Sequence, residues 1–537
     1  MKLNRKALAD SAVWEKAGFR LPQYDVERMV EETRKNPMWL HFGAGNIFRA
    51  FVANVQQEVL NAGKSDRGII VAGGQNHTII DKVYRAYDNL CALVTLKADG
   101  SIEKTVVASL AESVKVDDTD PSEWGRLQEI FRSPSLQMIS FTITEKGYSL
   151  VDAQGNYQAA VAADLEAGPK APQSYLGRLV ALLYERYLAG QLPVSLVSMD
   201  NCSHNGTKLH DAVVTFAQSW EEKGLAQKGF VAYLNDRSKV GFPWTMIDKI
   251  TPRPDASVKA MLAEVGFEDL ECDVANKDVY APFVNAEEAQ YLVIEDWFPA
   301  GRPQLEAGGV MFTDGPTVDK VEKMKVCTCL NPLHTALAVY GCLLGYDLIS
   351  KEMQDPQLKR MVEIIGYQEG LPVVVNPGIL DPKEFIDTVL QVRIPNPFMP
   401  DTPQRIATDT SQKLGIRFGE TIKAYAADPN RDVSSLRMIP LVQAGWCRYL
   451  LGVDDEGNAF TPSSDPLLEE NQKYLAGIKL GDTGDFHNQL QPILSNAAIF
   501  GVDLYEVGLG KKVEDYFAEL VAGKGAIRAT LKKYVGC

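Results

Sequence analysis

The chain has 537 residues, more than a single hydrophobic core usually organises, so we expect two domains. Hydrophobic residues make up 45% of it and charged residues 23%, proportions that exclude a disordered or fibrous protein. The formal net charge of -15 argues against nucleic acid or an anionic membrane surface as a partner, because both bind proteins through clustered Lys and Arg.

The sequence shows no sign of export, membrane insertion or metal binding. Its first residues lack the apolar core of a signal peptide, and no apolar run approaches the length that spans a bilayer. The eight cysteines are scattered, and Cys327 and Cys329 have no second pair at metal-ligand spacing, so we interpret them as buried apolar side chains. These features predict a cytoplasmic protein with reduced thiols and no metal.

Short apolar runs alternate with helical patterns in the first part of the chain. The runs lie at residues 39–43, 67–74, 136–144 and 192–200, and helical patterns lie at 50–63 and 208–224. Strands that alternate with helices pair in parallel, so we expect a Rossmann-type, doubly wound α/β domain with its site at the carboxyl ends of the strands. We place this domain at residues 1–314.

From about Asp314 the pattern changes to long helices. Helical periodicity is clear at residues 334–346, 357–370, 403–428 and 513–536. We therefore predict a mostly α-helical C-terminal domain at residues 315–537, with the boundary in the Gly- and Pro-containing stretch 299–317.

The loop after the first predicted strand, GAGNIFRA, contains two of the three glycines of a dinucleotide-binding turn. Gly43 and Gly45 allow a tight turn, and a helix that opens near Asn46 could hold a pyrophosphate with its free N–H groups. Phe48 occupies the third glycine position. The pattern alone is therefore weak, and an ordinary junction between a strand and a helix explains it about as well.

The second predicted strand ends without an acidic residue. Gly73, Gly74, Gln75 and Asn76 stand where an Asp or Glu normally binds the adenosine ribose and repels a 2′-phosphate. These residues leave the choice between NAD and NADP open.

The next two predicted strands end in polar residues. These are Thr144, Glu145 and Lys146 after one strand, and Asp200, Asn201, His204 and Asn205 after the other. Turn formation and helix capping account for many such residues, and we favour capping for Asn205. Asn201 directly follows an apolar strand, so a role in a site is at least as well supported there.

A third polar cluster begins the helical region. Pro332 suits the first position of a helix, which predicts Asn331 as the N-cap and places His334 in the first turn, where the helix dipole favours neutral imidazole. Glu322 and Lys325 are three residues apart and would share a helix face. From these residues alone, we favour a capped helix with a surface ion pair.

The last cluster is IPNPFMPDTPQRIATDTSQKL. Arg405 and Lys413 are eight residues apart, which is roughly 12 Å along a helix, and their long side chains could converge on one ligand. Cations on an acidic protein are more often solvated, but the Asn- and Pro-rich approach suits a rigid loop that delivers a helix into a cleft.

Together these segments resemble the mannitol dehydrogenase family of long-chain, zinc-independent polyol dehydrogenases, which includes fructuronate and tagaturonate reductases. The stretches that carry the resemblance are HFGAGNIFRAF, TITEKGY, MDNCSHNG, MIDKITPRP, Gly301-Arg302-Pro303, EKMKVCTCLNPLHTALAVYG and NPFMPDTPQRIATDTSQK. They follow one another from about residue 39 to 413, and the combination is far more specific than any one of them. Phe48-Arg49-Ala50 resembles the family's own form of the glycine loop.

The resemblance implies hydride transfer between a nicotinamide and a secondary alcohol carbon, without a metal. It implies Lys325 as general base, Asn201 and Asn331 as ligands of the reacting oxygen, His334 as an orienting partner, Glu322 as a proton relay, and Arg405 and Lys413 as substrate-binding cations. It implies a cofactor site formed by Gly43, Gly45, Asn46, Phe48, Arg49, Gly74, Thr144 and Glu145. A lysine base needs its pKa lowered by about three units from roughly 10.4, which desolvation and neighbouring positive charge can supply.

The sequence departs from the family pattern at two places, and one of them leaves an alternative for the general base. Lys325 precedes Asn331 by six residues where the family has one fewer, so VCTCL must absorb an extra residue, and Lys323 is an alternative base. The family's Val-Asp-Arg-Ile appears as Ile247-Asp248-Lys249-Ile250.

The leading hypothesis is an NAD-dependent dehydrogenase, with NADP as the alternative cofactor, acting on D-mannonate and D-fructuronate. A carboxylate substrate could be bound by Arg405, Lys413 or Lys249. Altronate/tagaturonate and mannitol/fructose are alternative substrates. A non-catalytic sensor of sugar acids is the alternative of another class. We expect a monomer or small homo-oligomer whose only partner is a small molecule.

Overall fold

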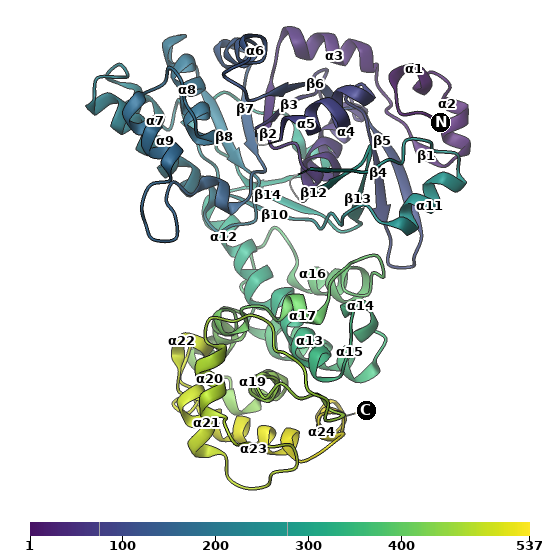
Figure 1. Cartoon of the computed structure of the whole chain (residues 1–537), viewed down its shortest axis with the longest axis vertical. Coiled ribbons are helices and arrows are strands. Elements are labelled where there is room, and N and C mark those ends of the chain that lie inside the picture. Colours follow the sequence, from purple (N-terminus) through teal and green to yellow (C-terminus); the bar gives the residue numbers. More distant parts are fainter. Residues whose placement is uncertain (75, 276–277, 537) are drawn as a thin grey trace. The chain divides into compact units, whose positions relative to one another are not determined.

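The computed structural model describes residues 1–74, 76–275 and 278–536, which form two compact units (Figure 1). Unit 1 comprises Met1–Leu96 and Ser101–Asp319, and unit 2 comprises Lys97–Gly100 and the chain from Lys320 onward. The division falls within helix α12 (Gly315–Met324), at whose first residue the sequence prediction placed the domain boundary.

The centre of unit 1 is a six-stranded parallel sheet in the order β6, β3, β2, β7, β8, β9. Its strands are β2 (Trp39–Phe42), β3 (Ile69–Gly73), β6 (Leu110–Lys115), β7 (Met138–Phe141), β8 (Val194–Ser198) and β9 (Val240–Gly241). The strands that come first in the chain, β2, β3 and β6, form one half of the sheet, and β7, β8 and β9 form the other half. This is the Rossmann order. The expected fold class is confirmed, and a crevice is expected between β2 and β7, where the order reverses.

Alternate strand residues build two separate cores, one on each face of this sheet. Leu40 and Phe42 join one core, and Trp39 joins the other. The helices that supply the first core are α6 (Pro121–Arg132), α7 (Ala159–Ala167), α8 (Tyr175–Leu188), α9 (Asn205–Glu222) and α10 (Phe230–Asn235). The second core contains α4 (Ala53–Asn61) and strands of the smaller sheets. All four residues of β2 are buried, as both covered faces require.

The smaller sheets of unit 1 combine parallel and antiparallel pairs. One has the order β1 (Phe19–Arg20), β5 (Ile102–Val107), β4 (Cys91–Leu96), β13 (Phe283–Glu287), another β10 (Thr245–Asp248), β14 (Tyr291–Glu295), β15 (Met311–Thr313), and a third pairs β11 (Asp273–Ala275) with β12 (Asp278–Tyr280). The remaining helices are α1 (Arg5–Leu8), α2 (Ser11–Lys16), α3 (Val26–Lys35), α5 (His77–Ile79) and α11 (Ala256–Glu264).

Unit 2 is helical from Lys320 onward apart from loops and one isolated bridge within its described residues, as the sequence predicts. Its helices are α13 (Asn331–Leu343), α14 (Ile349–Glu352), α15 (Pro356–Glu363), α16 (Pro382–Thr388), α17 (Pro403–Ile406), α18 (Glu420–Ala427), α19 (Met438–Tyr449), α20 (Leu468–Tyr474), α21 (His487–Leu494), α22 (Ala497–Phe500), α23 (Gly510–Val521) and α24 (Ala526–Val535). Their packing centres on α13 and α19, which contact each other.

The segment Gly315–Leu343 corrects the expectation that no apolar run reaches the length of a bilayer. This segment of 29 residues contains α12 and α13 and has a window of mean hydropathy 1.3, long and apolar enough to cross a membrane. However, 78% of that window is buried within the fold, and buried core helices commonly have this composition.

The helix expected at residues 403–428 is also corrected, because the chain breaks into short pieces there. Asp409 adopts a left-handed conformation (φ 54°), which ends α17 and its following turn. A π-helical turn, Gly415–Gly419, then leads into α18. Arg405 and Lys413 therefore do not share a continuous helix.

Candidate functional site

A pocket of about 210 Å³ lies at the carboxyl ends of β2, β3 and β7, where the Rossmann order reverses. Four of the predicted cofactor residues line it: Gly43, Gly45, Gly74 and Thr144. Asn76, Tyr175 and Tyr280 also line it, and only Asn76 stood out in the sequence. Gln75, named with the second strand, lies outside the described residues.

Three of the four glycines that line this pocket, Gly43, Gly45 and Gly74, have different structural roles. Gly43 has a φ of +124°, and a Cβ there would lie 2.3 Å from the Thr142 carbonyl oxygen. A Cβ on Gly74 would lie 1.8 Å from Cε2 of Tyr175. A Cβ on Gly45 would meet nothing within 4 Å, so this position borders open space. Gly43 and Gly74 are thus required by the fold, whereas Gly45 leaves room for a bound group.

The helix that follows the loop opens at Asn46, as expected, and passes through a π-helical turn, Phe48–Val52, before α4. The Phe48 ring stacks on His41 with 4.1 Å between centroids. Burial lowers the pKa of His41 to about 3, so the imidazole is neutral beneath the ring. Phe48 therefore packs the helix onto β2 at the position where other dinucleotide-binding loops have a third glycine.

Arg49 and Asn46 form the inner side of this loop. The buried Arg49 guanidinium donates to the Ala281 carbonyl at 2.6 Å and to Oδ1 of Asn46 at 2.7 Å. Glu145 lies on the surface, where its carboxylate accepts from Lys208 at 2.5 Å. Phe48, Arg49 and Asn46 thus lie behind the glycines and Glu145 lies beside the turn, and none of them lines the pocket.

Asp200, at the end of β8, organises the turn after β7. Its carboxylate accepts hydrogen bonds from the N–H groups of Ile143 and Thr144, both at 2.9 Å, and from the Tyr148 hydroxyl at 2.5 Å. Burial raises the pKa of Asp200, and these three donors oppose that rise. The sequence marked Asp200 as a polar strand end, but its contact with Thr144 depends on the pairing of β7 with β8.

Some neighbours of Asp200 in the sequence are buried and structural, whereas others are exposed. Asn205 is buried, and its side chain joins the Asp200 carbonyl to Thr245, so it ties β8 to β10. His204 is the N-cap of α9, without a capping side-chain bond, which corrects the expected capping role of Asn205. Asn201 is exposed at the same end of the sheet.

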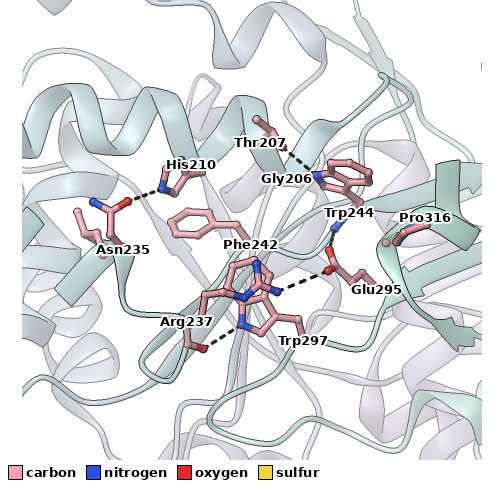
Figure 2. Close-up of a pocket in the computed structure, with 12 residues that line it drawn as sticks. Gly206, Thr207, His210, Asn235, Arg237, Phe242, Trp244, Glu295, Trp297 and Pro316 are labelled. Atoms are coloured by element: carbon pink, nitrogen blue, oxygen red, sulfur yellow. Dashed lines mark hydrogen bonds and ion pairs between the residues drawn. The ribbon is translucent and has the colours of Figure 1, made fainter. Parts of the chain in front are cut away.

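A second pocket in unit 1, of about 370 Å³, lies beside β9 and has aromatic walls (Figure 2). Arg237 stacks over Trp297 at 3.5 Å and lies 3.8 Å from Glu295. Trp244 donates from its backbone N–H to Glu295 at 3.0 Å. None of the predicted site residues lines this pocket. It lacks the glycine-rich strand ends that line the smaller pocket.

In unit 2, a π-helical turn, Lys325–Cys329, separates α12 from α13. The Leu330 N–H donates to the Lys325 carbonyl five residues back, at 3.1 Å. Such a turn accommodates one extra residue in a helix, which is compatible with the longer spacing between Lys325 and Asn331 that the sequence analysis noted. Lys325 is 3% exposed, whereas Lys323 is exposed. A general base works in a site shielded from bulk water, so the buried Lys325 is the better candidate base.

Asn331 and His334 lie three residues apart at the start of α13, both half-buried. Residues at this spacing share a helix face. The expected capping role of Asn331 is wrong: the N-cap is Leu330, which has no capping side chain, because the preceding π-helical turn leads directly into α13. The Asn331 side chain is therefore not needed as a cap. Glu322 is half-buried in the last turns of α12.

The basic residues of unit 2 differ in their surroundings. The Arg405 side chain is 62% exposed and pairs with Asp401. Lys413 is half-buried and donates to the Thr408 carbonyl. Burial, followed by the Arg417 charge, lowers the pKa of Lys413. Sequence reasoning missed Arg417, although it follows Lys413 by four residues.

Comparisons with known proteins cover nearly the whole chain. Residues 37–307 match the mannitol dehydrogenase Rossmann domain, and residues 317–520 match the mannitol dehydrogenase C-terminal domain. The D-mannonate oxidoreductase of Thermotoga maritima is 52% identical over 539 residues, covering 100% of this chain and 99% of that protein.

Two solved structures share the fold over their full lengths. One is the mannitol 2-dehydrogenase of Pseudomonas fluorescens in a ternary complex with NAD and D-mannitol, with 26% identity, a TM-score of 0.68 and 100% coverage of both chains. The other is a substrate-free D-sorbitol dehydrogenase with 24% identity and a TM-score of 0.79, covering 99% of this chain and 100% of that one.

Proposed function

Because the chain belongs to the mannitol dehydrogenase family, we propose that it transfers a hydride between NAD and a secondary alcohol carbon of a linear sugar acid. D-Mannonate and D-fructuronate are the proposed substrate pair. The observation that carries this choice is the 52% identity over the full length to the Thermotoga maritima D-mannonate oxidoreductase. The two basic side chains near each other in unit 2, Lys413 and Arg417, suit a substrate with a carboxylate.

The smaller pocket of unit 1 fits a dinucleotide. Gly45 borders open space where a Cβ would intrude on a pyrophosphate, and the helix that opens at Asn46 presents N–H groups there. Gly43, Gly74 and Thr144 shape the remaining walls. Phe48 and Arg49 do not line the pocket, but their contacts fix the first helical turn beside it. When bound, the nicotinamide supplies the acceptor or donor of the hydride.

Lys325 serves as the general base in this proposal. As hydride leaves the alcohol carbon, the hydroxyl proton moves to the Lys325 Nζ, and in the reverse reaction the ammonium returns it to the oxygen of the new alcohol. Lys325 is buried, so its Nζ is shielded from bulk water. Glu322, three residues before it and half-buried, relays that proton to solvent.

Asn201, Asn331 and His334 orient the reacting oxygen. Amide N–H groups stabilise negative charge that develops on this oxygen, and an imidazole can accept or donate a hydrogen bond to a substrate hydroxyl. Arg405 and Lys413 bind the far part of the substrate. Lys249, considered from the sequence, instead donates to Gln290 at 3.1 Å in unit 1. We keep a cytoplasmic location and a monomer or small homo-oligomer as predictions.

The proposal is tested by following NADH oxidation by the purified full-length chain with D-fructuronate, D-tagaturonate and D-fructose. We expect the highest kcat/KM with fructuronate. A higher value with tagaturonate or fructose would reassign the substrate, and no turnover of any of the three would contradict the proposed activity. The same assay with NADPH decides the cofactor, and we expect NADH to be preferred.

A further inference from the structure

Arg417 is a cation without a carboxylate partner among the described residues. It lies in the π-helical turn Gly415–Gly419 and is half-buried. Its guanidinium donates to the Thr335 hydroxyl at 2.5 Å. Burial lowers the pKa of Arg417 to about 10, and no nearby acid opposes this. A guanidinium has five N–H donors, so most of its hydrogen-bonding capacity is unused here.

The turn that carries Arg417 is held in place by close packing. Gly415 and Gly419 let the turn approach the end of α22, because a Cβ on Gly419 would lie 2.2 Å from the Phe500 carbonyl oxygen. The turn also packs against the π-helical turn that begins with Lys325. Removing a charge from water without a counter-ion is unfavourable, so a fold that retains one on a fixed turn suggests that an anion binds there.

The surroundings of Arg417 place that anion in the catalytic region of unit 2. Thr335, its hydrogen-bond partner, directly follows His334 in α13. Lys413 is close enough for the Arg417 charge to lower its pKa. Arg405 differs from both because Asp401 already neutralises it.

We infer that Arg417 binds the carboxylate of the sugar-acid substrate, with Lys413 beside it, and so determines the preference for sugar acids over uncharged polyols. The planar guanidinium matches a carboxylate through two parallel N–H···O bonds, and the Thr335 contact fixes its orientation. A polyol offers a hydroxyl in place of the carboxylate and leaves the guanidinium unpaired. This inference rests on the proposed dehydrogenase function and adds the residue that selects the substrate class.

The test compares D-mannonate with D-mannitol, which differ at the carbon that carries the carboxylate. For Arg417→Met we expect kcat/KM with mannonate to fall about 100-fold, and the value with mannitol to change less than about threefold. Arg417→Lys should recover part of the loss, because it keeps the charge but not the fork of donors. Arg360→Gln, on the surface of α15, is the matched control and should behave as wild type.

A binding measurement separates this inference from the proposed function. D-Mannonate should raise the Tm of the wild type but not of Arg417→Met, even if neither sugar is oxidised. The Tm of the unliganded variant should be no lower than that of the wild type, because the substitution removes an unpaired charge. Equal losses with mannonate and mannitol, or a mannonate-dependent Tm rise that survives in Arg417→Met, would overturn the inference.

Discussion

The carboxylate of Asp200 binds the backbone N–H of Thr144, which has a positive φ. Thr144 has a φ of 67°, which is rare for a β-branched residue, and its N–H donates to Asp200 Oδ1 at 2.9 Å. Ile143 and Tyr148 donate to the other carboxylate oxygen. Strained backbone of this kind persists only where the surrounding structure imposes it, and here it shapes one wall of the cofactor pocket.

Asp200→Asn should therefore weaken cofactor binding. An amide has one acceptor oxygen, so it cannot satisfy the donors on both sides, and we expect the Kd for NADH to rise about tenfold. Fluorescence titration of the purified variant measures this. Asp211→Asn, whose side chain is 69% exposed, is the control and should keep the wild-type Kd. An unchanged Kd in Asp200→Asn would show that the Thr144 conformation does not depend on this carboxylate.

The two glycines of the loop after β2 should respond differently to alanine. Gly43→Ala places a Cβ against the Thr142 carbonyl at a positive φ, so it should lower the unfolding free energy by about 2 kcal/mol or more. Gly45→Ala meets open space, so its stability should be nearly wild type while the Kd for NADH rises. Urea unfolding and cofactor titration on both variants distinguish the two roles. A Gly45→Ala variant that binds NADH normally would move the pyrophosphate away from this turn.

The Rossmann sheet was predictable because each of its strands is indicated by a short stretch of neighbouring residues. Runs such as RGIIVAGG are apolar over lengths typical of buried strands, and they became β2, β3, β7 and β8. The glycine-containing ends of β2 and β3 and the polar end of β7 also fall at one pocket, since parallel strands end at the same edge. The alternation of strands and helices predicted parallel pairing, whereas the strand order is known only from the structure.

The irregular helices were not predictable for the opposite reason. The π-helical turn at Gly415 keeps helical periodicity in the sequence, so the pattern predicted one uninterrupted helix over residues 403–428. Left-handed Asp409 carries no local signal that distinguishes it from an Asp within a helix. Arg417 was missed because its significance depends on the lack of an acidic neighbour within the described residues, which is a property of tertiary packing.

Glu352 should make the stability of the chain depend on pH. It is 0% exposed, and neither carboxylate oxygen has a hydrogen-bond partner among the described residues. Burial raises its pKa well above the ordinary value, so the folded chain holds a proton that the unfolded chain releases. The contribution of Glu352 to the unfolding free energy is therefore largest below the ordinary Glu pKa, and it is lost as pH rises through the pKa of the folded state.

Glu352→Gln removes this titrating carboxyl group, so the unfolding free energy should depend less on pH. Urea unfolding at about pH 5 and about pH 8 should give a smaller difference in unfolding free energy for Glu352→Gln than for the wild type. The variant should gain the most stability relative to the wild type at about pH 8. Exposed Glu506→Gln is the control and should keep the wild-type slope. A wild-type slope in Glu352→Gln would assign the effect to other groups.

Lys325 and Lys323 give the sharpest test of the mechanism, because they lie two residues apart in contrasting surroundings. Lys325 is 3% exposed at the start of a π-helical turn, and Lys323 is exposed. We expect Lys325→Ala to lower kcat by about 10² to 10⁴-fold with an unchanged Kd for NADH, as loss of a general base requires. Lys323→Ala should keep nearly full kcat. If Lys323→Ala loses turnover and Lys325→Ala retains it, the base is Lys323, and the π-helical turn then serves only to absorb the extra residue.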